Sequence, residues 1–240
     1  PVSWNELLVV FHGHDLIKFN PPIWFLVALF NCNILFYLVH FLRNKYLPAM
    51  FALTLLIGCT GFYLGKAQIT LPLYLDIAMT ALPFYVAGFW IRRYNFFLFP
   101  HHRFDKLIPL FVLLALLVMH FTATTLGMRT NNYSGNIFQV YIAAFAGIFM
   151  IMLLCKKVER VKIISYLGRY SIITLSIHGP ILHFLEPLIA RYIHNSWAQA
   201  TMLLFITLSI CILLTPLFLK VIPQMVAQKD LLKIKQIHTK

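Results

Sequence analysis

The chain has few charged residues, and the acidic ones are the scarcest. Of its 240 residues only 7 are Asp or Glu, against 20 Lys or Arg, and charged residues make up 11% of the sequence. A soluble globular domain carries about 25% charged residues, so the composition excludes that class. Apolar residues at 60% and a mean hydropathy of +0.80 indicate a membrane protein instead.

Cysteine is also scarce, and the sequence has no internal repeat. The four cysteines lie in or at the end of apolar runs and show neither metal-ligand spacing nor a disulfide framework. His12, His14 and Asp15 stand close together, but a metal site needs further ligands nearby, so we expect no bound metal. The lack of a period of about 20 to 50 residues argues against a solenoid.

Long apolar runs are what the sequence has instead. Most of them approach the ~20 residues that a helix needs to cross a bilayer, so the sequence predicts an all-α, polytopic transmembrane helix bundle with seven spans. The runs are Ile23–Leu42, Leu47–Leu64, Leu71–Trp90, Leu107–Thr124, Phe138–Cys155, Ile164–Ile193 and Trp197–Leu219.

The basic residues alternate from one side of the predicted membrane to the other. At the ends of the runs and between them, the Lys and Arg counts are 1, 2, 1, 4, 1, 5, 1 and 5 in chain order. Cytoplasmic segments carry the Lys/Arg excess, so the chain is predicted to start outside and end in the cytoplasm. The net charge of +13 is therefore a topology signal with some attraction to membrane lipids, and we expect no nucleic-acid partner.

The chain opens at Pro1, with neither Met nor the features of a signal peptide. We therefore expect a fragment of a longer protein. No stretch between the runs is long enough for a soluble domain, so residues 1–240 are predicted to form a single transmembrane domain whose N-terminal part is missing.

Ionisable side chains at membrane depth are costly and indicate function. The sixth run carries the most informative ones. Ser171, Thr174 and His178 follow helical spacing and form one polar stripe, and a kink or a break in the helix is expected near Gly179–Pro180. His178 has two interpretations: a histidine that faces a polar cavity and exchanges hydrogen bonds or protons, or a neutral histidine bonded to a carbonyl freed by Pro180.

Other candidates lie further from the centre of the predicted spans. Glu186 is a carboxylate in the sixth run, and Trp24 is either an aromatic that stacks on a sugar or a residue of the interfacial aromatic belt. Arg129 and Asn132 belong to the polar external segment, which either holds an anionic or sugar group or is a solvated turn. Asp76 is either a buried functional carboxylate or a residue that complements a helix N-terminus.

Several segments together resemble the acyltransferase 3 family of integral membrane O-acyltransferases, close to its glycan or fucose O-acetylase-like branch. They occur in the family's order along most of the chain. The segments are Pro21–Phe30 (PPIWFLVALF), Ala81–Arg93 (ALPFYVAGFWIRR), Asn132–Asn136 (NYSGN) with Tyr141–Gly147 (YIAAFAG), and Tyr166–Ser171 (YLGRYS) followed by His178.

The resemblance implies transfer of an acyl group, acetyl in most members, from acyl-CoA to a hydroxyl of an envelope carbohydrate or lipid-linked glycan. It implies acetyl-CoA as the donor, no bound cofactor, about ten spans in the full-length protein and a bacterial inner membrane location. His178 matches the family's later histidine, to which we assign a supporting catalytic role. The principal catalytic histidine is expected upstream of Pro1, so the fragment alone is expected to be inactive.

The resemblance also implies substrate-binding roles around the same cavity. These fall to Trp24, Arg129, Asn132, Ser171 and Glu186. The alternative is a polytopic transporter or flippase without acyl chemistry, because membrane-embedded His, Glu and Asp also occur in proton-coupled transport.

Overall fold

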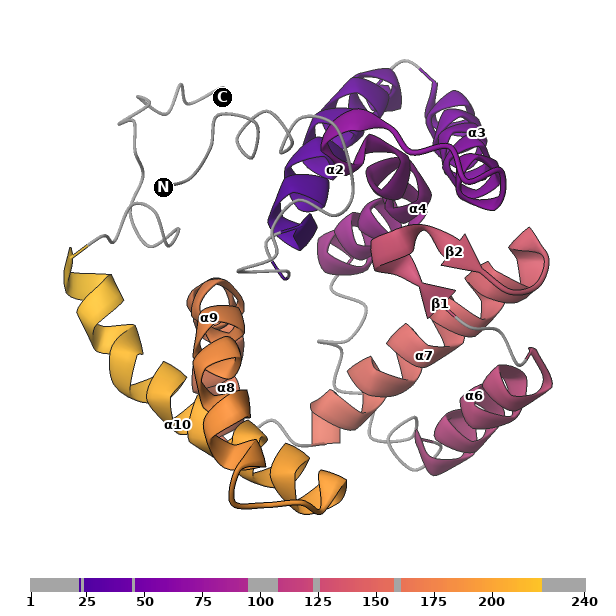
Figure 1. The fold of residues 1–240 in the computed structure, drawn as a ribbon. Helices are drawn as coiled ribbons and strands as arrows, with labels where there is room; N and C mark the ends of the chain where they lie inside the picture. Colours follow the sequence, from indigo (N-terminus) through magenta and orange to yellow (C-terminus); the bar gives the residue numbers. More distant parts are fainter. Residues whose placement is uncertain are drawn as a thin grey trace. The chain divides into compact units, whose positions relative to one another are not determined.

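The computed structural model describes Pro22 and residues 24–44, 46–94, 108–122, 126–157 and 161–221. Figure 1 shows that most of this part is helical, with one short two-stranded hairpin. The chain divides into two compact units, of which the first holds Trp24–Glu159 and the second Arg160–Lys240. The single transmembrane domain expected over residues 1–240 stays a prediction.

In its described residues, the N-terminal unit contains five long or medium helices, a hairpin and three short 3₁₀ turns. In chain order these are α2 (Trp24–His40), η2 (Phe41–Asn44), α3 (Leu47–Lys66), η3 (Pro72–Tyr74), α4 (Leu75–Arg93), α6 (Ile108–Thr122), β1 (Leu126–Gly127), η4 (Met128–Thr130), β2 (Asn132–Tyr133) and α7 (Ile137–Lys157). The antiparallel hairpin pairs Leu126 with Tyr133 and Gly127 with Asn132.

The described part of the C-terminal unit contains α8 (Lys162–Arg169), α9 (Ser171–Ala190) and α10 (Ser196–Val221), with α9 packed against α10. The helix does not break near Gly179–Pro180, because α9 is continuous through Pro180 and Pro187, and a kink there stays a prediction. The helical path is interrupted at Tyr170 instead, whose φ of −107° and ψ of 26° separate the short α8 from α9. Prolines are tolerated in transmembrane helices because neighbouring groups satisfy the carbonyls that they free.

Within the described residues, six helices are long and apolar enough to cross a bilayer, which confirms the all-α, polytopic membrane fold. They correspond to every predicted run except the fourth. That run forms α6, whose 15 residues reach about 22 Å, less than the ~30 Å of a bilayer core.

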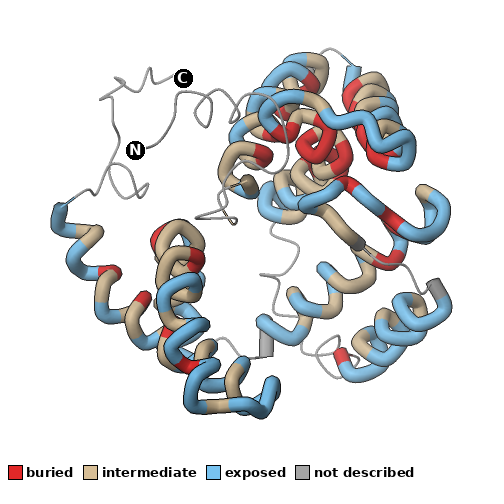
Figure 2. The backbone as a smooth tube through the Cα atoms, in the orientation of Figure 1, coloured by how far each residue is buried: buried red, intermediate tan, exposed pale blue. Residues whose placement is uncertain are grey.

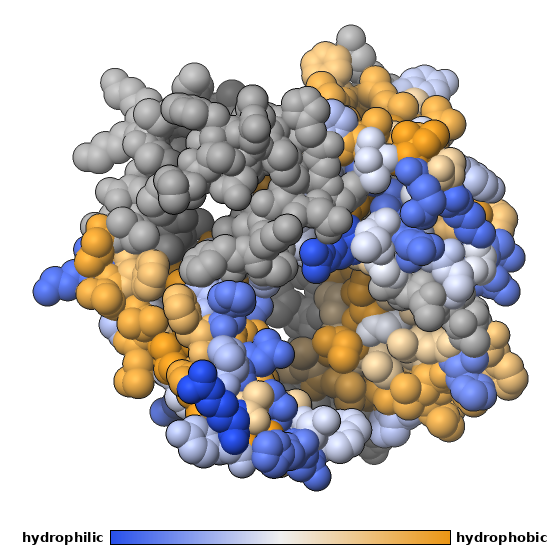
Figure 3. Space-filling view, in the orientation of Figure 1, coloured by the Kyte–Doolittle hydropathy of each residue, from blue (hydrophilic) through white to orange (hydrophobic). Residues whose placement is uncertain are grey.

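Large apolar side chains are exposed along most of these helices. Figure 2 shows that buried residues are concentrated in α2, α3 and α4, whereas α7, α9 and α10 are largely exposed or half-buried. Figure 3 shows apolar side chains over α10 and over the region of α6 and α7. A water-soluble protein rarely exposes such a large apolar surface, but lipid tails solvate it well.

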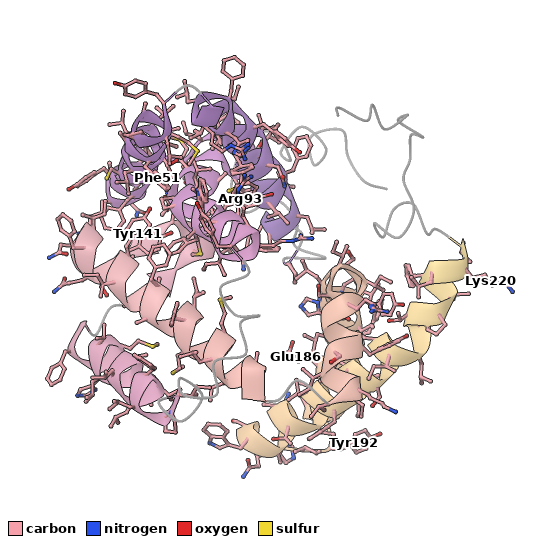
Figure 4. All side chains as sticks on the ribbon, turned by 180° about the vertical axis from the view of Figure 1, so that it is seen from behind. Phe51, Arg93, Tyr141, Glu186, Tyr192 and Lys220 are labelled. Carbon is pink, nitrogen blue, oxygen red and sulfur yellow. The ribbon has the colours of Figure 1, made fainter. Side chains whose placement is uncertain are left out.

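The main core lies where α2, α3 and α4 pack together. Small residues of α3 allow close packing against α4: a Cβ atom at Gly61 would lie only 2.5 Å from the backbone nitrogen of Thr80. The buried apolar residues of this core are Cys32, Phe36, Val39, Met50, Ala78, Leu82 and Val86. On the other side of α4, the Tyr141 hydroxyl of α7 donates to the Thr80 carbonyl at 2.8 Å (Figure 4).

Candidate functional site

The polar stripe predicted on α9 lines a groove against α10. Ser171, Thr174 and His178 form its α9 side, and Thr207 faces them from α10. The groove has a volume of about 290 Å³. Its other lining residues are leucines: Leu167, Leu175, Leu182, Leu204 and Leu208. The sequence pattern thus identified one wall of this groove.

The His178 ring has a defined hydrogen-bonding pattern. Its Nδ1 atom lies 2.9 Å from the carbonyl oxygen of Thr174, one turn earlier in α9. A carbonyl oxygen only accepts, so Nδ1 carries the hydrogen, and the neutral ring has its lone pair on Nε2. The accepting carbonyl belongs to Thr174, whereas Pro180 frees the carbonyl of Ser176, so the second interpretation of His178 is wrong in its choice of partner.

Thr174 and Thr207 share an unusual property within the described part of the chain. Their hydroxyl oxygens are buried and make no hydrogen bond. Thr207 is 4% exposed, so its hydroxyl is also out of reach of bulk solvent. A buried hydroxyl without a partner is costly, so two residues of the groove wall carry donors that no group of the described protein satisfies.

The remaining α9 candidates occupy exposed positions. Ser171 is exposed at the first position of α9 and lines the groove from that end. Glu186 is exposed two turns after His178, and Figure 4 shows it on α9. Its role in substrate binding stays a prediction, as does that of Ser171.

Trp24 lines a second and larger cavity inside the N-terminal unit. This cavity has a volume of about 720 Å³ and is bounded by parts of α2, α4, α6 and α7 and by Met128. The Trp24 ring is half-buried and lies 6.0 Å from Phe25 and 6.2 Å from Tyr74, measured between ring centroids. The Trp24 ring packs against Tyr74 and also lines the cavity. Neither of its two predicted roles, stacking on a sugar or belonging to the interfacial aromatic belt, is decided by this position.

The segment between α6 and α7, which the sequence predicts to be external, is attached to the membrane helices by Asn131, the residue before the site candidate Asn132. Its Nδ2 atom donates to Asp76 Oδ2 and to the Gly61 carbonyl, each at 3.1 Å. The Thr80 hydroxyl lies 3.1 Å from both Asn131 Oδ1 and the Asp76 carbonyl oxygen. Asn131 is 1% exposed and Asp76 fully buried, whereas Arg129 and Asn132 are exposed.

Asp76 combines both of its predicted interpretations. It lies in the first turn of α4, and its Oδ1 accepts a hydrogen bond of 3.3 Å from the backbone N–H of Leu71. It is also a fully buried acceptor for Asn131 in the segment between α6 and α7. Its charge acts on Tyr133, whose ring stacks on Phe62 at 5.5 Å. Burial, and then the Asp76 carboxylate, raise the pKa of Tyr133 above its ordinary value of 10.0, with a small opposing effect of Thr80.

Two of these polar residues escaped the sequence analysis as site candidates. Thr207 lies in an apolar run where a single threonine carries no signal, because most membrane threonines bond to their own helix. Asn131 was not distinguishable from Asn132 by residue type. Its left-handed backbone, with φ of 49°, turns its side chain toward Asp76.

No group of three or more His, Cys, Asp or Glu side chains in the described residues is arranged to hold a metal ion. His12, His14 and Asp15 lie outside the described residues.

Comparison of the chain with curated proteins and with solved structures gave no match in either case. A family model described as an acyltransferase domain matches residues 1–216, which is most of the chain. The match favours acyl transfer over the transporter interpretation, and the chain belongs to the acyltransferase 3 family of integral membrane acyltransferases.

Proposed function

We propose that the protein transfers an acyl group, acetyl in the first instance, from acyl-CoA to a hydroxyl of a cell-envelope carbohydrate at the bacterial inner membrane. The observation that carries this proposal is the state of His178. Its Nδ1 hydrogen is held by the Thr174 carbonyl at 2.9 Å, so Nε2 presents a lone pair on a ring that lines a groove. A lone pair fixed in this way suits the acceptance of a hydrogen bond from a reacting hydroxyl.

The reaction joins the acceptor hydroxyl to the acyl carbon. A base removes the hydroxyl proton while the hydroxyl oxygen attacks the thioester carbonyl carbon, and the carbonyl becomes an oxyanion. Collapse of that intermediate breaks the carbon–sulfur bond, and the thiolate leaves and takes the proton from the protonated base. The products are the O-acyl carbohydrate and free CoA.

His178 has a supporting role in this scheme, as the family resemblance implies. Its Nε2 accepts the hydrogen bond of the acceptor hydroxyl and aligns that hydroxyl for attack. Ser171 lies on the same face of α9 and adds a second polar contact. Trp24, Arg129, Asn132 and Glu186 are assigned to the acceptor, because a sugar needs aromatic stacking and many hydrogen bonds.

The test is transfer of label from acetyl-CoA to envelope glycans in membranes that contain the complete gene product. We expect transfer by the wild type and a strong loss in His178→Ala. His183→Ala is the matched control, because His183 lies in the same helix, is exposed and does not line the groove. Equal transfer by wild type and His178→Ala removes His178 from the machinery. Absence of transfer by well-expressed wild type, with acceptors of several classes, contradicts the proposed function.

A further inference from the structure

We propose that the groove between α9 and α10 binds the acyl end of the donor, with the acyl carbonyl oxygen accepting hydrogen bonds from the Thr174 and Thr207 hydroxyls. This inference rests on the proposed function and specifies which part of the donor occupies the groove. It starts from two hydroxyls that differ from the others in these helices.

Hydroxyl groups in the membrane helices of this protein normally bond to their own helix. A threonine or serine donates to the carbonyl oxygen four residues earlier, at 2.7–2.9 Å, and thereby satisfies its only donor. Thr54, Thr60, Ser176, Thr201, Ser209 and Thr215 follow this pattern. Thr174 and Thr207 depart from it, and both line the same groove.

The coincidence matters because the two residues come from different helices. Thr174 lies in the first turn of α9, and Thr207 lies in the middle of α10. Neither hydroxyl donates to a carbonyl of its own helix, and both residues line the same groove. We infer that the two hydroxyls share one acceptor. A single carbonyl oxygen has two lone pairs and can accept from both.

The lining excludes the more polar parts of the substrates. In the described residues, the groove has no Asp, Glu, Lys or Arg in its wall, so a phosphate or carboxylate would be buried without a counter-charge. Five leucines supply most of its wall, so a whole sugar ring inside it would leave several of its hydroxyls without partners, whereas the proposed reaction requires only the reacting hydroxyl to reach His178. An acyl thioester has one strong acceptor and an otherwise apolar body, which matches this lining.

The size of the groove fits the same part of the donor. Its volume of about 290 Å³ is near the lower limit of small-molecule pockets, which span roughly 300–1,000 Å³. Its α9 wall extends from Leu167 to Leu182. A groove of this volume has room for the end of a linear molecule and leaves the nucleotide outside.

The hydroxyl pair also has a consequence for the reaction. When the acceptor oxygen attacks, negative charge develops on the carbonyl oxygen that Thr174 and Thr207 contact. Hydrogen bonds aimed at that oxygen strengthen as the charge grows, and loss of one such donor lowers turnover by about 10²–10³-fold in other acyl-transfer enzymes. Thr207 is thereby expected to contribute more to turnover than to binding.

The experiment compares two non-transferable donor analogues on the purified complete protein in lipid nanodiscs. One analogue is acetyl-CoA with a methylene in place of the thioester sulfur, which keeps the carbonyl. The other is S-ethyl-CoA, which lacks the carbonyl. We expect wild type to bind the carbonyl analogue about tenfold more tightly by titration calorimetry, and Thr207→Val to reduce that preference about fivefold.

Two further variants control for folding and for helix position. Thr207→Ser keeps the hydroxyl and should keep the preference. Thr215→Val should also keep it, because Thr215 is buried in the same helix but donates to the Cys211 carbonyl at 2.7 Å and does not line the groove. An unchanged preference in Thr207→Val, or no preference in wild type, overturns the inference.

Label transfer from acetyl-CoA separates this result from a failure of the proposed function. Transfer that continues at the wild-type rate in Thr207→Val overturns the inference and leaves the proposed function intact. A carbonyl preference that depends on Thr207, in a protein that transfers no label to carbohydrate, supports the inference and contradicts the proposed acceptor.

Discussion

Asn131 donates a hydrogen bond of 3.1 Å to the carboxylate of Asp76 and thereby joins the segment between α6 and α7 to the first turn of α4. Both side chains are excluded from solvent, and the same Asn131 amide also reaches the Gly61 carbonyl of α3. One amide therefore connects three parts of the N-terminal unit. A buried carboxylate is tolerated only when its hydrogen bonds are made, so this contact is expected to dominate the stability of the unit.

Replacement of Asn131 by alanine should destabilise the protein strongly. The variant removes the donor to Asp76 and leaves the carboxylate under-bonded, and alanine does not favour the left-handed backbone at this position. We expect a loss of about 3 kcal/mol in the free energy of unfolding. The measurement is thermal unfolding of the purified protein in detergent.

Asn132→Ala is the matched control for this prediction. It removes the same side chain from the neighbouring position, where the residue is exposed. Its effect should stay within about 0.5 kcal/mol. Similar losses of unfolding free energy in Asn131→Ala and Asn132→Ala would show that the hydrogen bond to Asp76 does not dominate the stability of the unit.

Glycine replacements in α3 should reveal how closely α4 and the segment between α6 and α7 approach α3. A Cβ atom at Gly65 would lie 2.7 Å from Asn131 Cγ, and one at Gly61 would overlap the Thr80 backbone. Each alanine variant is expected to lose about 1–3 kcal/mol through overpacking. Thermal unfolding checks this, and a stable Gly61→Ala protein would be inconsistent with the described packing of α3 on α4.

Replacement of Gly88 in α4 by alanine should not destabilise the protein. No atom lies within 4 Å of the position that a Cβ would occupy there, so the methyl group meets no obstacle. Alanine is favoured over glycine inside a helix by about 1 kcal/mol. The variant should therefore be as stable as wild type or slightly more stable.

Alkaline pH should weaken, through Tyr133, the attachment of the segment between α6 and α7. Because its folded-state pKa is raised by burial and by Asp76, the folded protein retains the phenol proton where the unfolded chain releases it. The related stability is fully present below the unfolded pKa of about 10 and is lost as pH rises beyond it. Tyr133→Phe keeps the ring that stacks on Phe62 and should show a smaller fall in unfolding temperature above pH 10. Parallel falls in both proteins would refute this linkage.

The fold was largely predictable from the sequence, and the site only in part. Apolar runs set the helices because a bilayer demands about 20 such residues, and they located α2, α3, α4, α7, α9 and α10. Pro180 pointed to a kink or a break in α9, but the helix is continuous there, and the break in the helical path falls at Tyr170. The helical spacing of Ser171, Thr174 and His178 placed them on one face of α9, but it gave no information about the helix that packs against that face.

The partners across helices depend on tertiary packing, which a residue pattern does not encode. Thr207 faces the polar stripe only because α10 packs against α9 in one particular rotation. Asn131 reaches Asp76 only because of its left-handed backbone and the small residues Gly61 and Gly65. These contacts span dozens of residues, and the single sequence gives no measure of such pairings.

The predicted orientation places Asn132 outside and Lys162 in the cytoplasm. In a cysteine-free background, Asn132→Cys in intact cells should react with a membrane-impermeant maleimide, since residue 132 is exposed in the hairpin. Lys162→Cys, exposed at the start of α8, should react only after the membrane is opened. The reverse labelling pattern would invert the orientation inferred from the Lys/Arg counts.

His178→Gln should separate a hydrogen-bonding role of His178 from a role as proton carrier. Glutamine offers a carbonyl oxygen that accepts a hydrogen bond, but it does not titrate near neutral pH. If Nε2 only aligns the acceptor hydroxyl, His178→Gln should retain more label transfer than His178→Ala, by about tenfold, and its pH profile should match that of wild type. If His178 carries the proton, both variants should lose transfer to the same extent. The supporting role assigned here requires the first result, because Nδ1 is already held by Thr174 and Nε2 is the ring nitrogen left for the substrate.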